Sequence, residues 1–329
     1  MSIAAIPRAL IWRRVHSLMG LWIVLFLVEH LFVNSQAALL LGENGQGFVR
    51  AVNSIHNLPY LHVIEVVLLG VPIAIHLVWG LRRLFTSKAN SFGSDGSRPD
   101  MGEYGRNRAY TWQRITSGIL WVGLAAHVAK FRFLEYPWSV GVGESAAYFV
   151  TVRMDKGLYT VADRLGVELY DSQKIGAEKE QFERRRGEKT LLDVGAEIKE
   201  TGYYEGHSDL ILAAAQQYLQ KQEWIGALTR HPPQKGEVIA ACKNFGTATL
   251  LSVRDTFKSP LYCALYTIFV LAACFHAFNG LWTFLLTWGI VLKMSAQKSS
   301  TTFAWGLMAM VAFLGLAAIC GTYYLNLKS

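Results

Sequence analysis

The chain has 329 residues, of which 52% are hydrophobic and 17% charged, with a mean hydropathy of +0.24 and a formal net charge of +8. This composition indicates a membrane protein with one substantial polar part. Its four cysteines form no CxxC pair, which excludes a zinc site or an iron–sulfur cluster built on such pairs.

Five apolar segments are long enough to cross a bilayer, for which a helix needs roughly 20 predominantly apolar residues. They cover residues 18–41, 60–84, 115–133, 261–292 and 303–325. Helices are expected because an open sheet edge cannot be satisfied in hydrocarbon. The apolar run after residues 1–14 is too long for a signal peptide and lacks a small-residue cleavage site, so none is expected. The predicted fold class is an all-α membrane protein with five transmembrane helices.

The basic residues predict the orientation of these helices. Of the 15 lysines and arginines outside residues 132–258, 12 lie before the first segment, between the second and third segments, or between the last two. Only Arg50, Lys130 and Lys328 fall on the other side. The positive-inside rule therefore predicts a cytoplasmic N-terminus and an outward C-terminus in a multi-pass protein.

The long connection after the third segment differs from the rest of the chain. Residues 132–258 carry 17 basic and 18 acidic side chains and are nearly neutral, while the remainder has 15 basic and 6 acidic residues. We therefore expect three parts: helices one to three in 1–131, an extracytoplasmic α+β insert in 132–258, and helices four and five in 259–329. Within the insert the pattern predicts strands at 147–154, 238–241 and 247–253 and helices at 177–200 and 208–228. No metal or phosphate motif lies in it, so we expect a cap on the outer side.

Four histidines lie deep in the apolar segments, each on a different one: His30, His76, His127 and His276. An ionisable side chain at membrane depth is costly and usually marks a functional site. Four helices with one inward imidazole each could hold two metal centres, and two b-type haems are the obvious candidates. At about 1.5 Å per residue, His30 and His127 belong to the outer leaflet and His76 to the inner one. Spacing alone leaves the depth of His276 open.

A different interpretation applies to each histidine taken alone. An intramembrane histidine can simply hydrogen-bond a carbonyl of a neighbouring helix. His16 and His62 each precede a favoured histidine by 14 residues and lie near the same helix face. We expect these two and His56 to be interfacial or loop residues, and His207 and His231 to be polar residues of the insert.

Several blocks of sequence carry a family resemblance. They are RRVHSLMG at 13–20, VEHLFVN at 28–34, PIAIHLVWG at 72–80, QRIT at 113–116 with His127, and FHAFNGLWTF at 275–284 with TWGI at 287–290. Together they resemble the cytochrome b558 membrane anchor of succinate dehydrogenase (complex II), of the five-helix dihaem kind, which is related to the dihaem fumarate reductase anchor. The resemblance covers about 200 residues in five helices, and it implies a dihaem four-helix bundle plus one extra helix.

The resemblance also implies which residues bind the haems. His30 and His127 match the ligands of the haem farther from the cytoplasm, and His76 and His276 match those of the nearer haem. Bis-imidazole ligation fills both axial positions, which favours electron transfer over oxygen chemistry. Ser117 or a helix carbonyl could accept the other ring N–H. Glycines at 20, 70, 80, 118 and 123 could let helices or a macrocycle approach closely.

The implied function is electron transfer from succinate dehydrogenase to a membrane quinone. In the family a flavoprotein subunit oxidises succinate, an iron–sulfur subunit passes the electrons on, and the anchor carries them through its haems. This chain has no flavin or substrate motif, so we expect a non-catalytic subunit in the bacterial inner membrane, in contact with lipid and with no nucleic-acid partner. Its arginines on the inner side would dock the iron–sulfur protein: Arg8, Arg13, Arg14, Arg82, Arg83, Arg106 and Arg108.

The quinone site and two other functions remain open. By resemblance quinone binds near the outer haem, where the available polar groups are Glu65, His62, His56, Asn53 and Asn34. A carboxylate or imidazole there could transfer protons to the quinone, although Glu65 could equally be a structural partner within the bundle. The chain could instead anchor a fumarate reductase or another quinone-linked dehydrogenase, or be a haem-free scaffold whose histidines only bridge helices.

Overall fold

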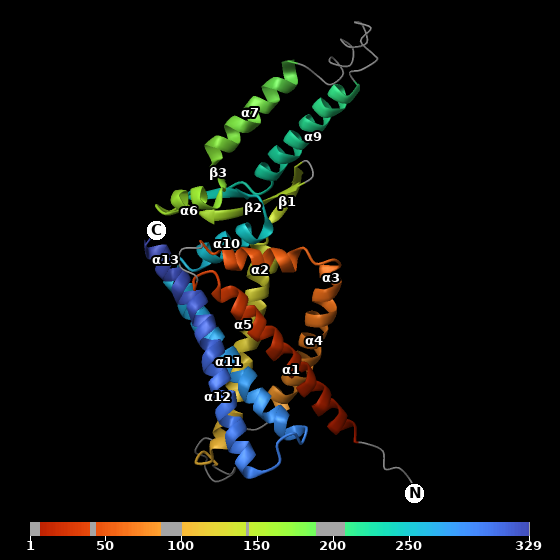
Figure 1. Cartoon of the computed structure of the whole chain (residues 1–329), viewed down its shortest axis with the longest axis vertical. Helices are drawn as coiled ribbons and strands as arrows, with labels where there is room; N and C mark the ends of the chain where they lie inside the picture. The colour runs from red at the N-terminus through yellow and green to blue at the C-terminus, as the bar shows by residue number, and fades with distance from the viewer. Residues whose placement is uncertain (1–6, 40–43, 87–100, 143–144, 189–207, 329) are drawn as a thin grey trace. The chain divides into compact units, whose positions relative to one another are not determined.

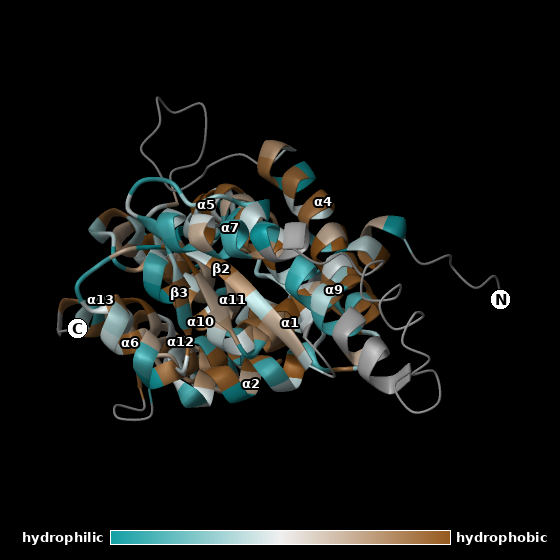
Figure 2. Ribbon diagram, turned by 90° about the horizontal axis from the view of Figure 1, so that it is seen from above, coloured by the Kyte–Doolittle hydropathy of each residue, from teal (hydrophilic) through white to brown (hydrophobic). Residues whose placement is uncertain are grey.

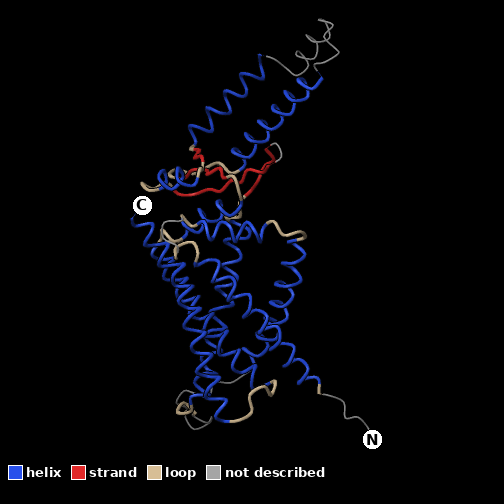
Figure 3. The backbone as a smooth tube through the Cα atoms, in the orientation of Figure 1, coloured by secondary structure: helices blue, strands red, loops and turns tan. Residues whose placement is uncertain are grey.

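A computed structural model describes residues 7–39, 44–86, 101–142, 145–188 and 208–328. The chain forms two compact units. The first comprises residues 1–131 and 257–325, and the second comprises residues 132–256 and 326–329. The first unit is helical, whereas the second combines helices with a small sheet (Figure 3).

The first unit is built from long helices that run side by side (Figure 1). Their bounds are α1 (Arg8–Ser35), α4 (Val71–Thr86), α5 (Gly105–Val128), α11 (Pro260–Thr287) and α12 (Met294–Leu316). Shorter pieces extend or join them: α2 (Gln46–His56), α3 (Leu61–Ile64), α13 (Thr322–Lys328) and the π-helical segments η1 (Glu65–Gly70), η2 (Ala129–Leu134) and η3 (Ala317–Gly321). The sequence did not predict α2.

Four described helices are long and apolar enough to cross a membrane: Arg8–Ser35, Leu61–Thr86, Pro260–Thr287 and Met294–Leu327. The protein is therefore a multi-pass membrane protein, as the composition predicted. In Figure 2, α4 is mainly hydrophobic, whereas α7 of the second unit is mainly hydrophilic. The third predicted segment corresponds to α5, which is not among the four; Gln113, Arg114 and His127 lower its hydropathy.

The packing contacts place four of these helices in a ring. Helix α1 packs on α4 and α11, and α5 also packs on α4 and α11. Consequently α1 lies opposite α5, and α4 lies opposite α11. Helix α12 packs on α1 and α11 and is the fifth member of the unit. This arrangement is a four-helix bundle with an additional helix on one side.

Close helix contacts occur at four glycines. A Cβ atom at Gly20 would lie 2.9 Å from Cε1 of His76, and one at Gly123 would overlap the ring of Phe269. On α12 and η3, a Cβ at Gly315 would come within 2.5 Å of Val270, and one at Gly321 within 2.7 Å of Ala38. The sequence had singled out positions 20 and 123 correctly. The backbone at positions 70, 80 and 118 has more room, so those glycines are not required by contact.

The second unit contains a four-stranded antiparallel sheet in the order β1–β2–β4–β3. Its strands are β1 (Trp138–Val142), β2 (Ser145–Arg153), β3 (Glu168–Tyr170) and β4 (Glu237–Cys242). Its helices are α6 (Leu158–Leu165), α7 (Ser172–Glu188), α9 (Ser208–Arg230) and α10 (Phe245–Thr256).

Alternating residues of the central strands fill two apolar cores. Val150 and Val152 of β2 pack with residues of α6 and α10, while Phe149 packs on the other face with residues of α7 and α9. The period of two along a strand produces this alternation, and helices cover both faces of the sheet. Phe149 on one face is 0% exposed and Val150 on the other is 2% exposed, so both faces are buried inside this unit.

The predicted elements of the insert are mostly confirmed. The strands at 147–154 and 238–241 correspond to β2 and β4, and the helix at 208–228 corresponds to α9. Residues 177–188 are helical, and 189–200 lie outside the described residues. The strand predicted at 247–253 is wrong, because this segment belongs to α10. The Asn244 side chain accepts hydrogen bonds from the Thr247 backbone N–H and hydroxyl, both at 2.9 Å, and starts a helix there.

Candidate functional site

The first pair of intramembrane histidines lies across the ring of helices. His30 is on α1 and His127 is on the opposite helix, α5. Their ring centroids are 5.8 Å apart, and the ring planes are nearly perpendicular at 87°. The bundle therefore brings together two residues that lie 97 positions apart in the sequence.

The second pair lies on the other diagonal. His76 on α4 and His276 on α11 have ring centroids 6.2 Å apart and ring planes at 82°. His16 joins this group, because its ring stacks on that of His76 at 4.1 Å and 11°. The sequence had predicted His16 as an interfacial residue, yet the structure places it directly against a favoured histidine.

These separations fit one metal atom held between two imidazoles. A ligating imidazole nitrogen lies about 2 Å from its metal, so two rings on opposite sides of one metal have centroids roughly 6 Å apart. Both pairs match this distance. Among the described residues, no group of three or more His, Cys, Asp or Glu side chains is placed to hold a metal. Each pair offers two imidazoles, a number that matches bis-histidine ligation of a haem iron.

Three of the four histidines have an oxygen partner for Nδ1. Nδ1 of His76 lies 3.1 Å from the carbonyl oxygen of His16, and Nδ1 of His276 lies 3.3 Å from the carbonyl oxygen of Gln113. Nδ1 of His127 lies 3.3 Å from the Tyr266 hydroxyl. Metal-bound histidines usually donate their second ring N–H to such an acceptor, which leaves Nε2 for the metal. The Ser117 hydroxyl donates to the carbonyl oxygen of Arg114 at 2.7 Å and is not the partner of any of these three Nδ1 atoms.

A polar network between α5 and α11 fixes the position of His276. The Gln113 side chain donates to the carbonyl oxygen of His276 at 3.0 Å and accepts from Asn279 at 2.7 Å. The Thr116 hydroxyl lies 3.5 Å from Nδ1 of His276. Sequence reasoning had quoted Gln113 and Asn279 only as parts of family blocks. Their signal was a pair of amides inside otherwise apolar helices, where such groups need partners.

The comparisons with known proteins agree with the blocks quoted from the sequence. The chain is 22% identical over 315 residues to the succinate dehydrogenase cytochrome b558 subunit of Bacillus subtilis (strain 168), covering 95% of this chain and 96% of that protein. The resemblance to the cytochrome b558 family is confirmed. No protein-family model matches the chain, and no solved structure matches it.

The polar residues predicted for a quinone site lie on three parts of the helical unit: α1, α2, and the stretch formed by α3 and η1. Glu65 and His62 face each other at 3.5 Å on the stretch formed by α3 and η1, with the His62 side chain 82% exposed. Asn34 donates to the carbonyl oxygen of His30 at 2.8 Å. Asn53 and His56 belong to α2, a helix that packs on α1. The structure thus pairs Glu65 with His62 and ties Asn34 to a histidine of the bundle.

Proposed function

We propose that this chain is the dihaem cytochrome b membrane anchor of a succinate:quinone oxidoreductase and passes electrons from an iron–sulfur subunit to a membrane quinone. The observation that carries the proposal is the pairing of four histidines from four helices into two diagonal pairs at metal-sharing distance. The named relative, a succinate dehydrogenase cytochrome b558 subunit, supports the enzyme class.

In this proposal the residues of the chain bind and orient two b haems. His30 and His127 would hold one, and His76 and His276 would hold the other. When bound, the haems supply reversible one-electron chemistry. Two imidazoles on one iron would favour electron transfer over ligand binding. Tyr266 and the carbonyls of His16 and Gln113 contact the rings at their Nδ1 atoms, which would leave Nε2 to hold the iron.

The proposal includes α5 as a fifth spanning helix. Helix α5 packs on α4 and α11, two helices that qualify as membrane spans, and its His127 faces His30 on a third. A helix enclosed by neighbours can keep polar residues at membrane depth, because those residues find partners inside the bundle. With five spans the charge rule predicts an N-terminus in the cytoplasm of a bacterium and an extracytoplasmic insert between α5 and α11.

The basic residues at the inner ends would dock the soluble subunits, which we infer to be a flavoprotein and an iron–sulfur protein. Arg14, Arg82, Arg83 and Arg106 lie over tryptophan rings at 5.1–5.9 Å, a contact that already gives them a structural role. Arg8, Arg13 and Arg108 are exposed and are the better candidates for a partner surface. Charges at such a surface set mainly encounter rate and register.

We place the quinone site near the outer pair, with Glu65 and His62 as the groups for proton transfer. Their 3.5 Å contact would allow a proton to move between carboxylate and imidazole while one of them faces the quinone oxygen. An anchor of a fumarate reductase or of another quinone-linked dehydrogenase would use the same pairs. The subunits that copurify with the chain distinguish these alternatives.

The experiment is a haem determination on the purified chain and on single histidine variants. We expect two haems per chain and a reduced-minus-oxidised b-type spectrum. His127→Ala should halve the haem content, and His276→Ala should remove the other half, while His231→Ala in the insert leaves both. Folded protein without haem would instead favour a scaffold whose histidines only bridge helices.

A further inference from the structure

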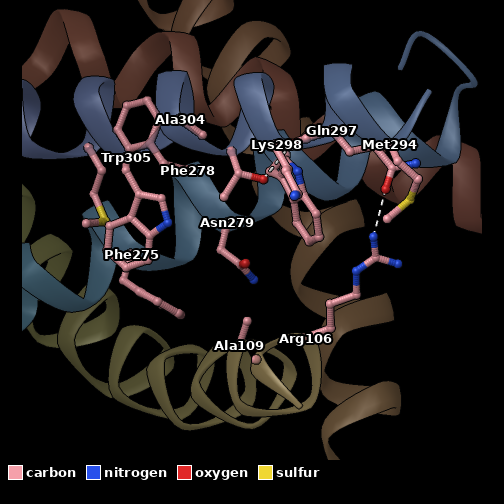
Figure 4. Close-up of a pocket in the computed structure, with 14 residues that line it drawn as sticks. Arg106, Ala109, Phe275, Phe278, Asn279, Met294, Gln297, Lys298, Ala304 and Trp305 are labelled. Carbon is pink, nitrogen blue, oxygen red and sulfur yellow. Dashed lines mark hydrogen bonds between the residues drawn. The ribbon is translucent and has the colours of Figure 1, made fainter. Parts of the chain in front are cut away.

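A pocket with a cavity volume of about 400 Å³ lies among α5, α11 and α12 (Figure 4). None of the four histidines or of the residues considered for quinone lines it, although Asn279 also bonds to Gln113 beside His276. Its walls come from the first turns of α5 and α12 and from the second half of α11. Its size lies within the range for sites that bind small molecules or parts of larger ones.

The deeper wall of this pocket is apolar and the remaining part is cationic. Phe275, Phe278 and Trp305 form apolar wall, and Arg106 and Lys298 supply two positive charges (Figure 4). None of the described residues that line it is acidic. The N-terminal ends of α5 and α12 add positive partial charge, since unpaired backbone N–H groups point outward there.

Donors in the pocket are already oriented. The Arg106 guanidinium donates to the Gln297 side chain at 2.7 Å and lies 5.8 Å from the centroid of Trp282. One such bond leaves further guanidinium N–H groups to donate, because arginine has five.

We propose that this pocket binds the phosphate and upper acyl region of an anionic glycerophospholipid. Basic pockets between membrane helices on the cytoplasmic side bind anionic lipid headgroups, and the charge distribution predicts that side for the ends of α5 and α12. The phosphate lies between Arg106 and Lys298, and the acyl chain lies against Phe275 and Trp305.

Two other small ligands fit the pocket less well. A quinone that is reduced needs a proton donor, and the described lining residues include no His, Tyr, Asp or Glu. Free phosphate would leave the aromatic wall exposed to water. An anionic lipid satisfies both the cationic and the apolar part, and the lipid proposal does not depend on haem binding.

The test uses the full-length chain in nanodiscs of phosphatidylcholine, with phosphatidylglycerol added at increasing mole fraction and retained lipid counted by native mass spectrometry. The pocket variant is Arg106→Gln with Lys298→Gln. The control is Arg8→Gln with Arg82→Gln, which removes two charges on the same predicted side but outside the pocket. We expect the pocket variant to weaken phosphatidylglycerol retention by about thirtyfold, the factor expected for two basic side chains, and the control by less than about threefold.

A second variant tests the apolar wall. Thr301→Phe adds volume inside the pocket without changing its charge and should also release the lipid. Circular dichroism and haem content identify any variant that fails to fold. Equal retention in the pocket and control variants overturns the site. Displacement of phosphatidylglycerol by inorganic phosphate or by a short-chain quinone would assign the pocket to that ligand instead.

Discussion

The lack of a side chain at Gly20 leaves room for the ring of His76, a member of the inner histidine pair. A Cβ there would lie 2.9 Å from Cε1 and 3.2 Å from Nδ1 of His76, closer than neighbouring atoms normally approach. The His76 ring would have to move, and its contact with the His16 carbonyl would be lost. The displaced His76 should therefore bind the proposed inner haem more weakly, while binding of the proposed outer haem should be unchanged.

We predict that Gly20→Ala lowers haem content from two towards one per chain, with loss of the component that His276→Ala also removes. Gly118→Ala is the matched control, because a Cβ at that position meets nothing within 4 Å. Haem determination together with difference spectra measures both variants. Full haem content in Gly20→Ala would contradict the role assigned to this contact.

Tyr266 is the positioning residue of the outer pair. Its hydroxyl lies 3.3 Å from Nδ1 of His127, and an acceptor at this place raises the basicity of a metal-bound imidazole. A more basic ligand stabilises the oxidised iron. Removal of the hydroxyl should therefore raise the reduction potential of the proposed outer haem while leaving haem content unchanged.

For Tyr266→Phe we expect an increase of about 20–60 mV, the equivalent of one ordinary hydrogen bond in a one-electron couple. Tyr262→Phe on the same helix is the control, since the Tyr262 ring lies 4.9 Å from Nζ of Lys130 and, among the described residues, contacts no histidine ring. A redox titration followed in the haem spectrum measures the change. An unchanged potential would show that the hydroxyl only packs against the ring.

At the scale of elements, α10 is held in the second unit by an ion pair in which the arginine is buried and the aspartate side chain is 30% exposed. The Arg254 side chain donates to both carboxylate oxygens of Asp155 at 2.8 and 3.0 Å, and Arg254 is only 8% exposed. Asp155 also accepts from the Gly157 backbone N–H near the start of α6. Removing the carboxylate charge would leave a buried guanidinium without its counter-ion, which is strongly destabilising.

We predict that Asp155→Asn destabilises the insert by about 2–4 kcal/mol. The control is Glu180→Gln, which breaks the exposed pair with Arg184, and such pairs contribute only about 0–1 kcal/mol. The measurement is the unfolding temperature of the insert in the full chain, detected as the temperature at which a protease begins to cut within residues 132–256. Similar unfolding temperatures for both variants would contradict the structural role of the buried pair.

At the scale of the whole molecule, the membrane topology decides what the second unit can contact. Both ends of this unit continue into helices of the first unit, η2 following α5 and α11 following residue 256. The charge rule predicts that this unit is extracytoplasmic, and we propose that it forms a cap there. It then takes no part in binding succinate, which we assign to a partner subunit on the opposite side.

Protease added outside intact spheroplasts should therefore cut within residues 132–258, and the helical unit should stay protected. Replacing the insert with a short Gly/Ser linker should preserve succinate oxidation by a soluble dye but change quinone reduction. Cleavage that occurs only in inside-out vesicles would reverse the topology and remove the basis for a cap.

The membrane character, the long apolar helices and the four histidines within them could be predicted from the amino-acid sequence alone. These features follow from local composition, because a run of about 20 apolar residues and a histidine within it can be recognised without knowing what they contact in the fold. The family blocks around His76 and His276 carried the resemblance for the same reason. The strands 147–154 and 238–241 were equally legible, since each has an alternating or continuous apolar pattern bounded by turn residues.

The contacts between side chains could be read only from the folded structure. The stacking of His16 on His76, the Tyr266 contact and the Gln113–Asn279 bridge join residues that are 60 or more positions apart or lie on different helices. Residues 247–253 illustrate the same limit: a short apolar run fits a strand or a buried helix equally well by period. The Asn244 side chain caps the helix, and the apolar residues of this segment are buried in a core of the second unit. These contacts select the helix, and they exist only in the folded chain.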